Sequence, residues 1–346
     1  MSTRSIRDDE QSVVSAVRHL VIDGGRSKTR ARARQADGSV REVIGPGMPI
    51  VTQPGAADAV RERVAWISRE LGARDVETLV FASNGVHIPD PVVETTLLGL
   101  IRQIIAADRV VIASDMVTSF VGALGIRPGI VLATGTGTIA MAVDDSLEAR
   151  RIDGWGPYAG DRGSGYALGR AALDVVHRTA DGADDAPALT RAWTDLHGSL
   201  QEGATTIYSS DNPVGVVAAF AEQVLALAAR GDEVATSLVD TQVSALVDTV
   251  RLCRHHAGPR APLAMTGGLS NSAYLRERLR SRLPPDQTWR PAQGDAVDGA
   301  ELLARSKLPV LTSVSAWYGR HSQKPTSSRQ DPNPAPTRDV STSAMP

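Results

Sequence analysis

The sequence predicts an α/β protein with two lobes, each a mixed sheet with flanking helices, and a cleft between the lobes. The chain has 346 residues, which is too long for one compact core and suits two domains and a tail. Apolar strands alternate with amphipathic helices in the first part of the chain. A hairpin with a glycine-rich turn occurs twice, at 19–40 and 129–146. This doubling suggests two related lobes that present their turns to one cleft.

The first lobe is predicted over residues 17–112, after a flexible stretch at 1–16 that carries charges of both signs. Its expected elements are a strand at 20–22, a second strand after the glycine-rich turn, a turn at Asp37-Gly38, a helix at 56–71, a strand at 78–82, a helix at 91–107 and a strand at 109–113. This alternation of strands and helices is typical of a mostly parallel sheet with helices packed on it.

The second lobe is predicted over residues 113–296. It is expected to contain a short helix to residue 124, the second hairpin, a mostly helical region and a strand at 262–265. Asn212 and Pro213 predict the start of one long helix, Gly231 its end, and a second helix is expected at 233–256. Further helices are expected at 273–283 and 297–304. We expect residues 297–318 to pack back onto the first lobe.

Composition limits the classes of partner and cofactor. The formal charge is −2 with both signs well mixed, which predicts neither nucleic-acid nor membrane binding. No apolar run reaches the roughly 18 residues of a membrane span, and the first 11 residues lack the apolar core of a signal peptide, so we expect a cytoplasmic protein. Cys253, the one cysteine, excludes intramolecular disulfides and multi-cysteine metal clusters within one chain, and we expect it to be buried. The proline-rich residues 319–346 are predicted to be a disordered tail.

The first glycine-rich turn follows the strand at 20–22. Gly24 and Gly25 allow backbone N–H groups to approach phosphate oxygens, and Ser27 and Thr29 can add hydroxyl donors. Asp23, at the end of the strand, could hold Mg²⁺ directly or through water, because hard cations favour carboxylate oxygen. An ordinary hairpin turn would have a similar composition.

The second turn is the more informative one. Thr134-Gly135-Thr136-Gly137 alternates hydroxyl residues with glycines after an apolar strand, where glycine would otherwise weaken the strand. It offers several donors and no bulky side chain, which favours a phosphate ligand. The sequence lacks the P-loop pattern G-x-x-x-x-G-K-[ST] and a G-x-G-x-x-G that opens a helix, so ordinary P-loop and dinucleotide-binding sites are excluded.

Two further segments contain candidate catalytic or binding residues. Asp115 follows the strand at 109–113, where a carboxylate could orient an attacking hydroxyl for phosphoryl transfer, although Asp there could equally be a helix N-cap. The segment GWGPYAGDRGSGY at 154–166 is too rich in glycine to be core. Its Asp161, which we expect to be exposed, could accept from sugar hydroxyls with Trp155 packed beside them. The alternative is an irregular surface loop.

Four segments in this order resemble one protein family. DGGRSKT resembles its first phosphate motif, ATGTGT its second, GWGPYAGDRGSGYALG its substrate loop and MTGGLSNS its adenosine motif. The resemblance spans residues 20–304 and is to the N-acetylglucosamine kinases of the BadF/BadG/BcrA/BcrD ATPase family, in the sugar kinase/actin/Hsp70 ATPase superfamily. It implies a two-lobed actin-like ATPase fold of the ribonuclease H-like type, which uses ATP and Mg²⁺ and phosphorylates a sugar.

The resemblance also assigns roles to individual residues. Those implied to contact the β- and γ-phosphates with Mg²⁺ are Asp23, Gly24, Gly25, Ser27, Lys28, Thr29, Thr134, Gly135, Thr136 and Gly137. Gly267 and Gly268 would lie against adenosine. Asp115 stands where the family places its catalytic carboxylate, and the positions implied to contact the sugar are Asn84, Gly85, Asp115, Trp155, Gly156 and Asp161.

The expected reaction is transfer of the γ-phosphoryl group to a hydroxyl of N-acetylglucosamine or glucosamine, giving the 6-phosphate. Relatives suggest a homodimer. Two departures stand out: Arg162 replaces the Glu of the family's G-D-E-G-S, and IASD lacks the Asn often found before the catalytic Asp. A non-catalytic ATP-binding sensor is the alternative. Iron–sulfur ATPases that activate dehydratases need more cysteines than Cys253 alone supplies.

Overall fold

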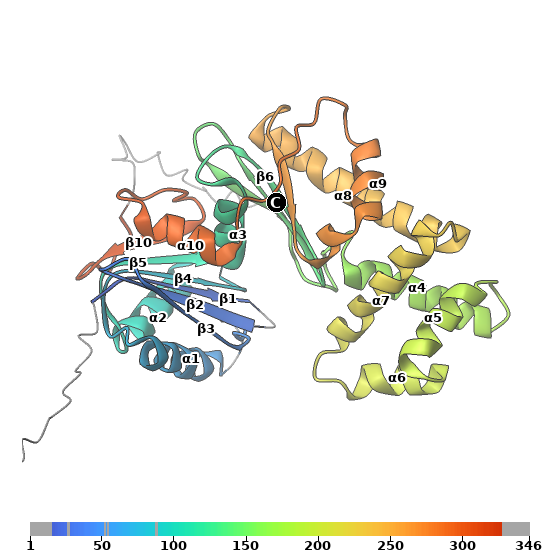
Figure 1. The fold of residues 1–346 in the computed structure, drawn as a ribbon, viewed down its shortest axis with the longest axis horizontal. Helices are drawn as coiled ribbons and strands as arrows, with labels where there is room; N and C mark the ends of the chain where they lie inside the picture. Colours follow the sequence, from blue (N-terminus) through green and yellow to red (C-terminus); the bar gives the residue numbers. More distant parts are fainter. Residues whose placement is uncertain (1–15, 26–27, 52, 54, 87–88, 327–346) are drawn as a thin grey trace, which may run out of the picture.

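The computed structural model describes residues 16–25, 28–51, 53, 55–86 and 89–326. Figure 1 shows a six-stranded sheet with its helices at one end of the molecule and a group of helices at the other. A four-stranded sheet lies between them. The late helix α10 (Ala296–Arg305) and strand β10 (Ser315–Gly319) return to the first sheet. The chain therefore crosses between the two sheets twice.

The six-stranded sheet has the order β10-β5-β4-β1-β2-β3. Its other strands are β1 (Val17–Gly24), β2 (Lys28–Gln35), β3 (Val40–Pro46), β4 (Asp75–Ser83) and β5 (Ala106–Ser114). β1, β4 and β5 are parallel, while β2, β3 and β10 are antiparallel to their neighbours. Helices α1 (Ala56–Leu71) and α2 (Pro91–Arg102) cover one face, and α3 (Asp115–Leu124) and α10 cover the other.

The side chains of strand β2 alternate between buried alanines on one face of this sheet and arginines on the other. Ala31 and Ala33 are buried, whereas the alternate residues are arginines that meet helix α10. Side chains two apart in a strand share a face, as do side chains three apart in a helix, so the two series can pair repeatedly. The three ion pairs, which we call the β2–α10 ladder, are Arg30–Asp295 at 2.6 Å, Arg32–Asp298 at 2.9 Å and Arg34–Glu301 at 2.6 Å.

The second sheet has the order β8-β7-β6-β9. Its strands are β6 (Gly129–Thr134), β7 (Thr138–Val143), β8 (Ala149–Asp153) and β9 (Leu263–Thr266). One apolar cluster joins this sheet to the first. It includes Val21 and Val111 from the first sheet, Val131 and Ala264 from the second, and Phe120 from α3. Because α3 and α10 contribute most of the remaining side chains, these two helices form the packed connection between the sheets.

The second half of the chain is mainly helical. Its helices are α4 (Gly165–Ala180), α5 (Pro187–His197), α6 (Leu200–Ser209), α7 (Pro213–Ala229), α8 (Glu233–Ala257), the short 3-10 helix η1 (Gly268–Asn271) and α9 (Ala273–Arg282). They pack around Trp193 and Phe220, whose rings meet edge to face. Cys253 is buried in this core, and desolvation raises the pKa of its thiol to about 12.

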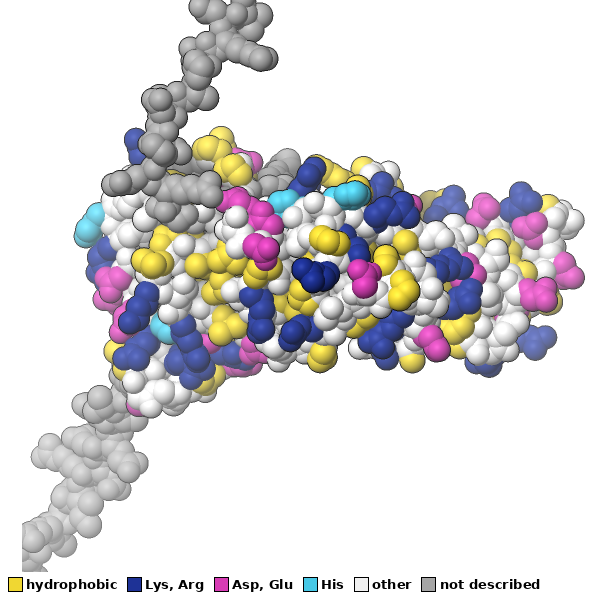
Figure 2. Space-filling model, turned by 90° about the horizontal axis from the view of Figure 1, so that it is seen from above, with side chains coloured by type: hydrophobic (Ala, Val, Ile, Leu, Met, Phe, Trp, Pro, Cys, Tyr) yellow, Lys and Arg dark blue, Asp and Glu magenta, His cyan; other side chains and the backbone are white. Residues whose placement is uncertain are grey.

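No single helix in the described part of the chain is long and apolar enough to cross a bilayer. Helices α7 and α8 reach that length and composition only when taken together, and they are bent by 117° at the break between them. Figure 2 shows basic and acidic side chains interspersed along the face of the molecule seen from above.

Most predicted elements are confirmed at the level of type and position. The predicted helix at 56–71 coincides with α1, and Asn212 caps α7 by accepting from the Gly215 N–H at 3.0 Å. The helix predicted at 91–107 is wrong at its end, because α2 stops at Arg102 and residues 106 and 107 pair with β4 as part of β5. The bounds of the two lobes stay a prediction.

The predicted start of the tail at residue 319 is too early. Arg102 donates to the carbonyl oxygens of Gly319 and Ser322, and Arg320 pairs with Asp108 at 2.6 Å. These contacts hold the chain against the first sheet beyond β10. The predicted flexible residues 1–15 and most of the tail, 327–346, lie outside the described residues.

Candidate functional site

Three parallel strands end together at one edge of the first sheet. Gly24 pairs with Ser83, and Ser83 pairs with Ser114 in the next strand. The register therefore brings the chain ends that carry Asp23, Asn84 and Asp115 to the same edge, although 92 residues separate Asp23 from Asp115 in the sequence. The carboxyl edge of a parallel sheet is where α/β folds bind ligands.

Asp23 is the most perturbed carboxyl group at this edge. Its pKa is raised to about 7, first by desolvation and then by the negative charge of Asp115, while Arg30 on the neighbouring strand lowers it. Its Oδ1 atom is buried and has no hydrogen-bond partner. An orphaned, buried carboxylate oxygen fits a metal ion or a water bound to one.

Magnesium could be held here by Asp23 as a single protein carboxylate. Among the described residues, no three His, Cys, Asp or Glu side chains are grouped closely enough to form a metal cluster. Mg²⁺ typically keeps several waters and takes one or two carboxylates together with phosphate oxygens. The residues therefore fit a metal ion that arrives with a nucleotide.

The loop after β4 supports the first glycine-rich turn through hydrogen bonds. Asn84 donates its Nδ2 amide to the Gly24 carbonyl at 3.1 Å and to the Met48 carbonyl at 3.0 Å. Its Oδ1 atom is buried and unpaired. A side chain at Gly24 would meet Met48 at 2.9 Å, and one at Gly85 would meet Ile50 at 2.4 Å. Asn84 thus supports the turn and leaves one buried acceptor unpaired.

The end of the first turn has one exposed and one buried polar residue. Lys28 begins β2 and is exposed, as a phosphate-binding lysine must be before its ligand arrives. Thr29 is buried and its Oγ1 has no hydrogen-bond partner. Gly25 accepts from the Met48 N–H at 3.0 Å. Ser27 lies outside the described residues.

Asp115 is the first residue of helix α3. The N-cap position belongs to Ser114, so the alternative interpretation of Asp115 as the N-cap is wrong. The Thr118 hydroxyl donates to the Asp115 carbonyl at 2.9 Å and closes the first helical turn. A carboxylate in the first turn is stabilised by the positive end of the helix dipole. Asp115 is close enough to Asp23 for its negative charge to raise the pKa of Asp23.

The second turn contacts the segment after β9 through backbone atoms. Gly267 has φ of 87°, and a Cβ there would lie 2.3 Å from the Thr134 carbonyl oxygen. A Cβ at Gly135 would approach the Gly268 nitrogen at 3.4 Å. The Thr134 hydroxyl is buried against that of Thr138 at 3.0 Å. Glycine is therefore required at position 267, where the predicted adenosine segment touches the predicted phosphate turn.

Helix α4 begins directly against the second turn. The Gly165 N–H donates to the Gly135 carbonyl at 2.8 Å, and the Tyr166 N–H donates to the Thr136 carbonyl at 3.1 Å. Ser164 caps this helix of 16 residues by accepting from the Ala167 N–H. The positive end of the helix dipole thus lies at the turn, which favours an anionic ligand there.

The loop between β8 and α4 is organised by two buried acids. The fully buried Asp153 carboxylate accepts from the backbone N–H groups of Asp161 at 2.9 Å and Arg162 at 2.8 Å. Asp161 accepts from the Gly156 N–H at 3.0 Å and lies so close to Gly137 that a Cβ there would be 2.4 Å from its Oδ2. The loop is therefore packed against the second turn.

The expectation that Asp161 is exposed is wrong. It is 6% exposed, in a left-handed conformation with φ of 54°, because its carboxylate binds the backbone of the loop. The large exposed side chains of the loop are Trp155, Tyr158 and Arg162, at 66%, 85% and 59%. The Arg151 guanidinium stacks over the Trp155 ring at 4.2 Å, and Arg162 pairs with Asp153 at 3.5 Å. The open face of the loop is thus aromatic and cationic.

A cavity of about 850 Å³ opens beside the second turn. Its lining residues come from the turn, helix α7, η1 and the start of α9. They are Gly135, Thr136, Gly215, Ala218, Ala219, Glu222, Leu225, Ala226, Ala229, Gly268, Leu269, Asn271, Ser272, Ala273 and Tyr274. Sequence reasoning found the glycines at the rim. It missed the wall from α7, whose only signal was a stripe of small residues that also suits a helix core.

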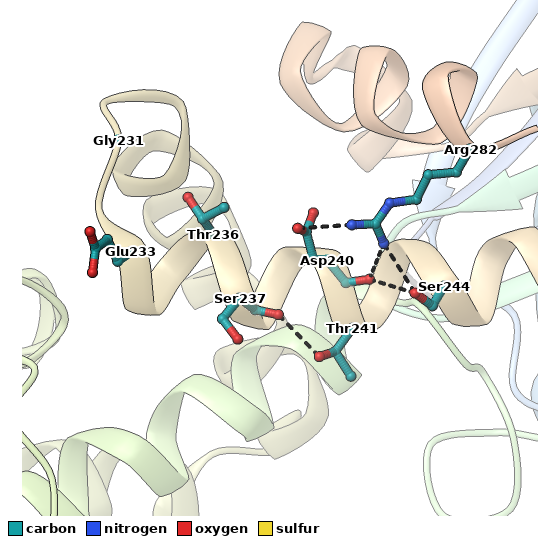
Figure 3. A pocket seen from close by; sticks show the side chains of 8 residues that line it. All are labelled: Gly231, Glu233, Thr236, Ser237, Asp240, Thr241, Ser244 and Arg282. Carbon is teal, nitrogen blue, oxygen red and sulfur yellow. Dashed lines mark hydrogen bonds and ion pairs between the residues drawn. The ribbon is translucent and has the colours of Figure 1, made fainter.

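A second hollow, of about 610 Å³, lies on helix α8 and is lined by polar side chains (Figure 3). Asp240 accepts from Arg278 and Arg282, and Arg282 also donates to the Ser244 hydroxyl at 3.0 Å. The Thr241 hydroxyl donates to the Ser237 carbonyl at 3.0 Å. These groups satisfy one another, so the cavity beside the second turn is the better ligand site.

The structure brings the predicted site residues together in two groups. The first sheet gathers Asp23, Asn84 and Asp115, and the second turn meets Gly268 and Asp161. The cavity lining comes entirely from residues after Thr134. That the first turn grips the same ligand stays a prediction.

Comparison with known proteins supports one family. The profile of the BadF/BadG/BcrA/BcrD ATPase family matches residues 20–304. An N-acetylmuramic acid/N-acetylglucosamine kinase of Clostridium acetobutylicum is 23% identical over 302 residues, 83% of this chain and 97% of that protein. An N-acetyl-D-glucosamine kinase of Dictyostelium discoideum is 29% identical over 170 residues, 47% of this chain and 53% of that protein.

Solved structures agree. A candidate N-acetylglucosamine kinase from Chromobacterium violaceum is 27% identical with a TM-score of 0.66, over 84% of this chain and 99% of that one. A second, from Porphyromonas gingivalis, is 19% identical with a TM-score of 0.64 over the same shares, and shows the fold alone. The predicted two-lobed actin-like ATPase fold is confirmed. The chain belongs to the BadF/BadG/BcrA/BcrD ATPase family.

Proposed function

We propose that this protein is an ATP-dependent sugar kinase that transfers the γ-phosphoryl group to the 6-hydroxyl of N-acetylglucosamine. The observation that carries the proposal is the cavity of about 850 Å³ that opens directly at the glycine-rich second turn, where helix α4 also begins. A nucleoside in the cavity would place its phosphates at backbone N–H groups and at the positive end of a helix dipole. The names of the related kinases support the same activity.

The two turns would divide the triphosphate between them. Gly135 and Thr136 of the second turn line the cavity, and the first turn would supply Lys28 and the unpaired Thr29 hydroxyl. Phosphoryl transfer is catalysed mainly by positioning and by neutralising the charge of the transferred group. Mg²⁺ at Asp23 would supply part of that neutralisation.

Asp115 is the proposed base. It lies at the ligand edge of the sheet, and the negative charge of Asp115 helps to raise the pKa of Asp23. Asp23 is thus the carboxyl group of the pair that is displaced toward the protonated form. An ionised carboxylate can orient the sugar hydroxyl and accept its proton as the phosphorus–oxygen bond forms.

The loop at 154–163 would bind the sugar. Trp155 offers an exposed ring for the apolar face of a pyranose, and Gly156 holds the buried Asp161 carboxylate in place. Arg162 adds an exposed cation where the family usually has an anion. A protonated amine beside this guanidinium would be repelled, so the acetylated amino sugar is favoured over glucosamine.

The test is an ADP-release assay with ATP and Mg²⁺ over N-acetylglucosamine, glucosamine, N-acetylmuramic acid and glucose. We expect turnover with N-acetylglucosamine, several-fold weaker use of glucosamine, and a loss of at least about 10³-fold in kcat for Asp115→Asn with nucleotide binding retained. Asp108→Asn, an exposed acid at the far end of β5, is the matched control and should keep full activity.

Two results would contradict the proposal. Full turnover in Asp115→Asn would remove Asp115 from the role of base. ATP binding without phosphorylation of any sugar in the panel would identify the protein as a non-catalytic nucleotide sensor.

A further inference from the structure

We propose that Glu222 binds the ribose of the nucleotide by accepting hydrogen bonds from its 2′- and 3′-hydroxyls, and so restricts the phosphoryl donor to ribonucleotides. The inference rests on the proposed nucleotide site in the cavity. It assigns a specificity role to a residue of helix α7 that no motif of the sequence marked.

One face of α7 lines the whole length of the cavity. The lining positions are Gly215, Ala218, Ala219, Glu222, Leu225, Ala226 and Ala229. They recur at intervals of three and four residues, which is the spacing of a single helical face. All except Glu222 are small or apolar, so the helix offers one charged acceptor within a wall that otherwise suits a flat ring.

The position of Glu222 along the helix sets its depth in the cavity. Ala218 marks the end of the cavity that we assign to the phosphates, because it lies beside the second turn. A Cβ added at Gly165 would lie 3.2 Å from the Ala218 carbonyl oxygen and 2.9 Å from the Gly135 carbonyl oxygen. With a rise of 1.5 Å per residue, Glu222 lies about 6 Å beyond Ala218 along the axis, and Ala226 about 12 Å beyond it. Ribose follows the phosphates in a nucleotide and the base follows the ribose, so Glu222 lies level with the ribose.

The chemistry of a carboxylate suits this place. Ionised Glu accepts hydrogen bonds through two oxygens and donates none, and the ribose diol offers two adjacent O–H donors. The adenine edge presents an acceptor beside its amino donor, which a carboxylate cannot match with both oxygens. Glu222 is exposed in the absence of ligand, so its charge bears no burial cost before the nucleotide enters.

The experiment measures equilibrium binding by calorimetry, with Mg²⁺ and without sugar, of ADP, 2′,3′-dideoxy-ADP and GDP. The proteins are the full chain, Glu222→Ala, Glu222→Gln and Glu233→Gln. The last is the matched control, an acid at the start of α8 that lines the other hollow (Figure 3). Thermal unfolding verifies that each variant is folded.

We expect the unsubstituted protein to bind ADP about 10-fold or more tighter than the dideoxy nucleotide, as for hydrogen bonds to a charged group. Glu222→Ala should weaken ADP by a similar factor and abolish the discrimination, Glu222→Gln should lie between, and Glu233→Gln should match the unsubstituted protein. If Glu222→Ala weakens both nucleotides equally, or changes the ratio of ADP to GDP affinity instead, the inference is overturned. Failure of the unsubstituted protein to bind ADP at all overturns the nucleotide site itself.

Discussion

Helices α3 and α10 cross at two glycines, and the contact is close enough to test by adding a single carbon atom. A Cβ at Gly299 would lie 1.9 Å from the Thr118 carbonyl oxygen and 2.4 Å from the Gly122 nitrogen. Both obstacles are backbone atoms, so no side-chain rotation can relieve the clash. Gly299→Ala therefore forces the helices apart by about 1 Å or more.

The expected cost follows from two opposing effects. Overpacking of this kind destabilises by about 1–3 kcal/mol, and a backbone clash belongs near the upper end of that range. Replacing Gly by Ala within a helix stabilises the folded protein by up to about 1 kcal/mol, because Ala has the higher helix propensity. The net loss of about 2 kcal/mol should lower the midpoint of thermal unfolding by roughly 3 °C.

Gly99→Ala is the matched control, since Gly99 lies in helix α2 with no atom within 4 Å of its added Cβ. That change should raise the midpoint by roughly 1 °C with unchanged kinetics. Because α3 begins at Asp115, separation of the helices should also displace the proposed base, so Gly299→Ala should reduce kcat more than it raises the KM for sugar. Calorimetry and steady-state assays measure both effects. Equal stabilisation by the two substitutions would refute the close crossing.

Two further predictions concern pH and charge. Asp23 has a pKa of about 7 in the folded protein against 3.8 when unfolded, so between these pH values the folded state holds a proton that the unfolded state loses. In the absence of metal and nucleotide, the free energy of unfolding should therefore fall by up to about 4 kcal/mol as pH rises from about 4 to 7. Asp23→Asn should flatten that profile. Unfolding midpoints between pH 5 and 8 measure this, and parallel profiles would contradict it. For Glu301, burial opposes ionisation, but hydrogen bonds from His19 and Arg34 outweigh it and lower the pKa from 4.5 to about 2. The resulting stabilisation is present above pH 4.5 and is lost as pH falls toward 2. Glu301→Gln should lower the free energy of unfolding at pH 7 by about 2–3 kcal/mol, as measured by denaturant unfolding. An unchanged midpoint would show that the ion pair is not stabilising.

The sequence predicted elements whose signals are local. Helix α1 has an apolar face every three or four residues and begins after Gly55, and α7 begins with Asn212-Pro213, so both starts could be located from residue type alone. The end of α2 could not, because Ala106 belongs to a strand only through its pairing with Asp75 in β4. Alanine has no local preference strong enough to reveal that partner.

The candidate site shows the same difference between local signals and contacts across the chain. Glycines marked both turns because close backbone approach leaves no room for a side chain. The burial of Asp161 was missed because it depends on Asp153, an acid whose carboxylate organises the loop from the end of a neighbouring strand. The place of Glu222 in the cavity wall was also missed, since it arises only when α7 lies beside η1 and α9. Pairings across the chain, rather than local composition, decide these roles.

The connection between the sheets relates the proposed base to the proposed nucleotide site, which lie on different parts of the chain. The β2–α10 ladder fixes α10 to the strand that leaves the first turn, and α10 in turn packs against α3, which begins at Asp115. Strand β2 and the proposed base are therefore parts of one packed unit. The cavity, the second turn and α4 belong to another, joined to the first through the same two helices. In the proposed mechanism, a nucleotide in the cavity of the second unit would extend its phosphates toward the first, and the packing of α3 on α10 would set the distance between the phosphate and the proposed base.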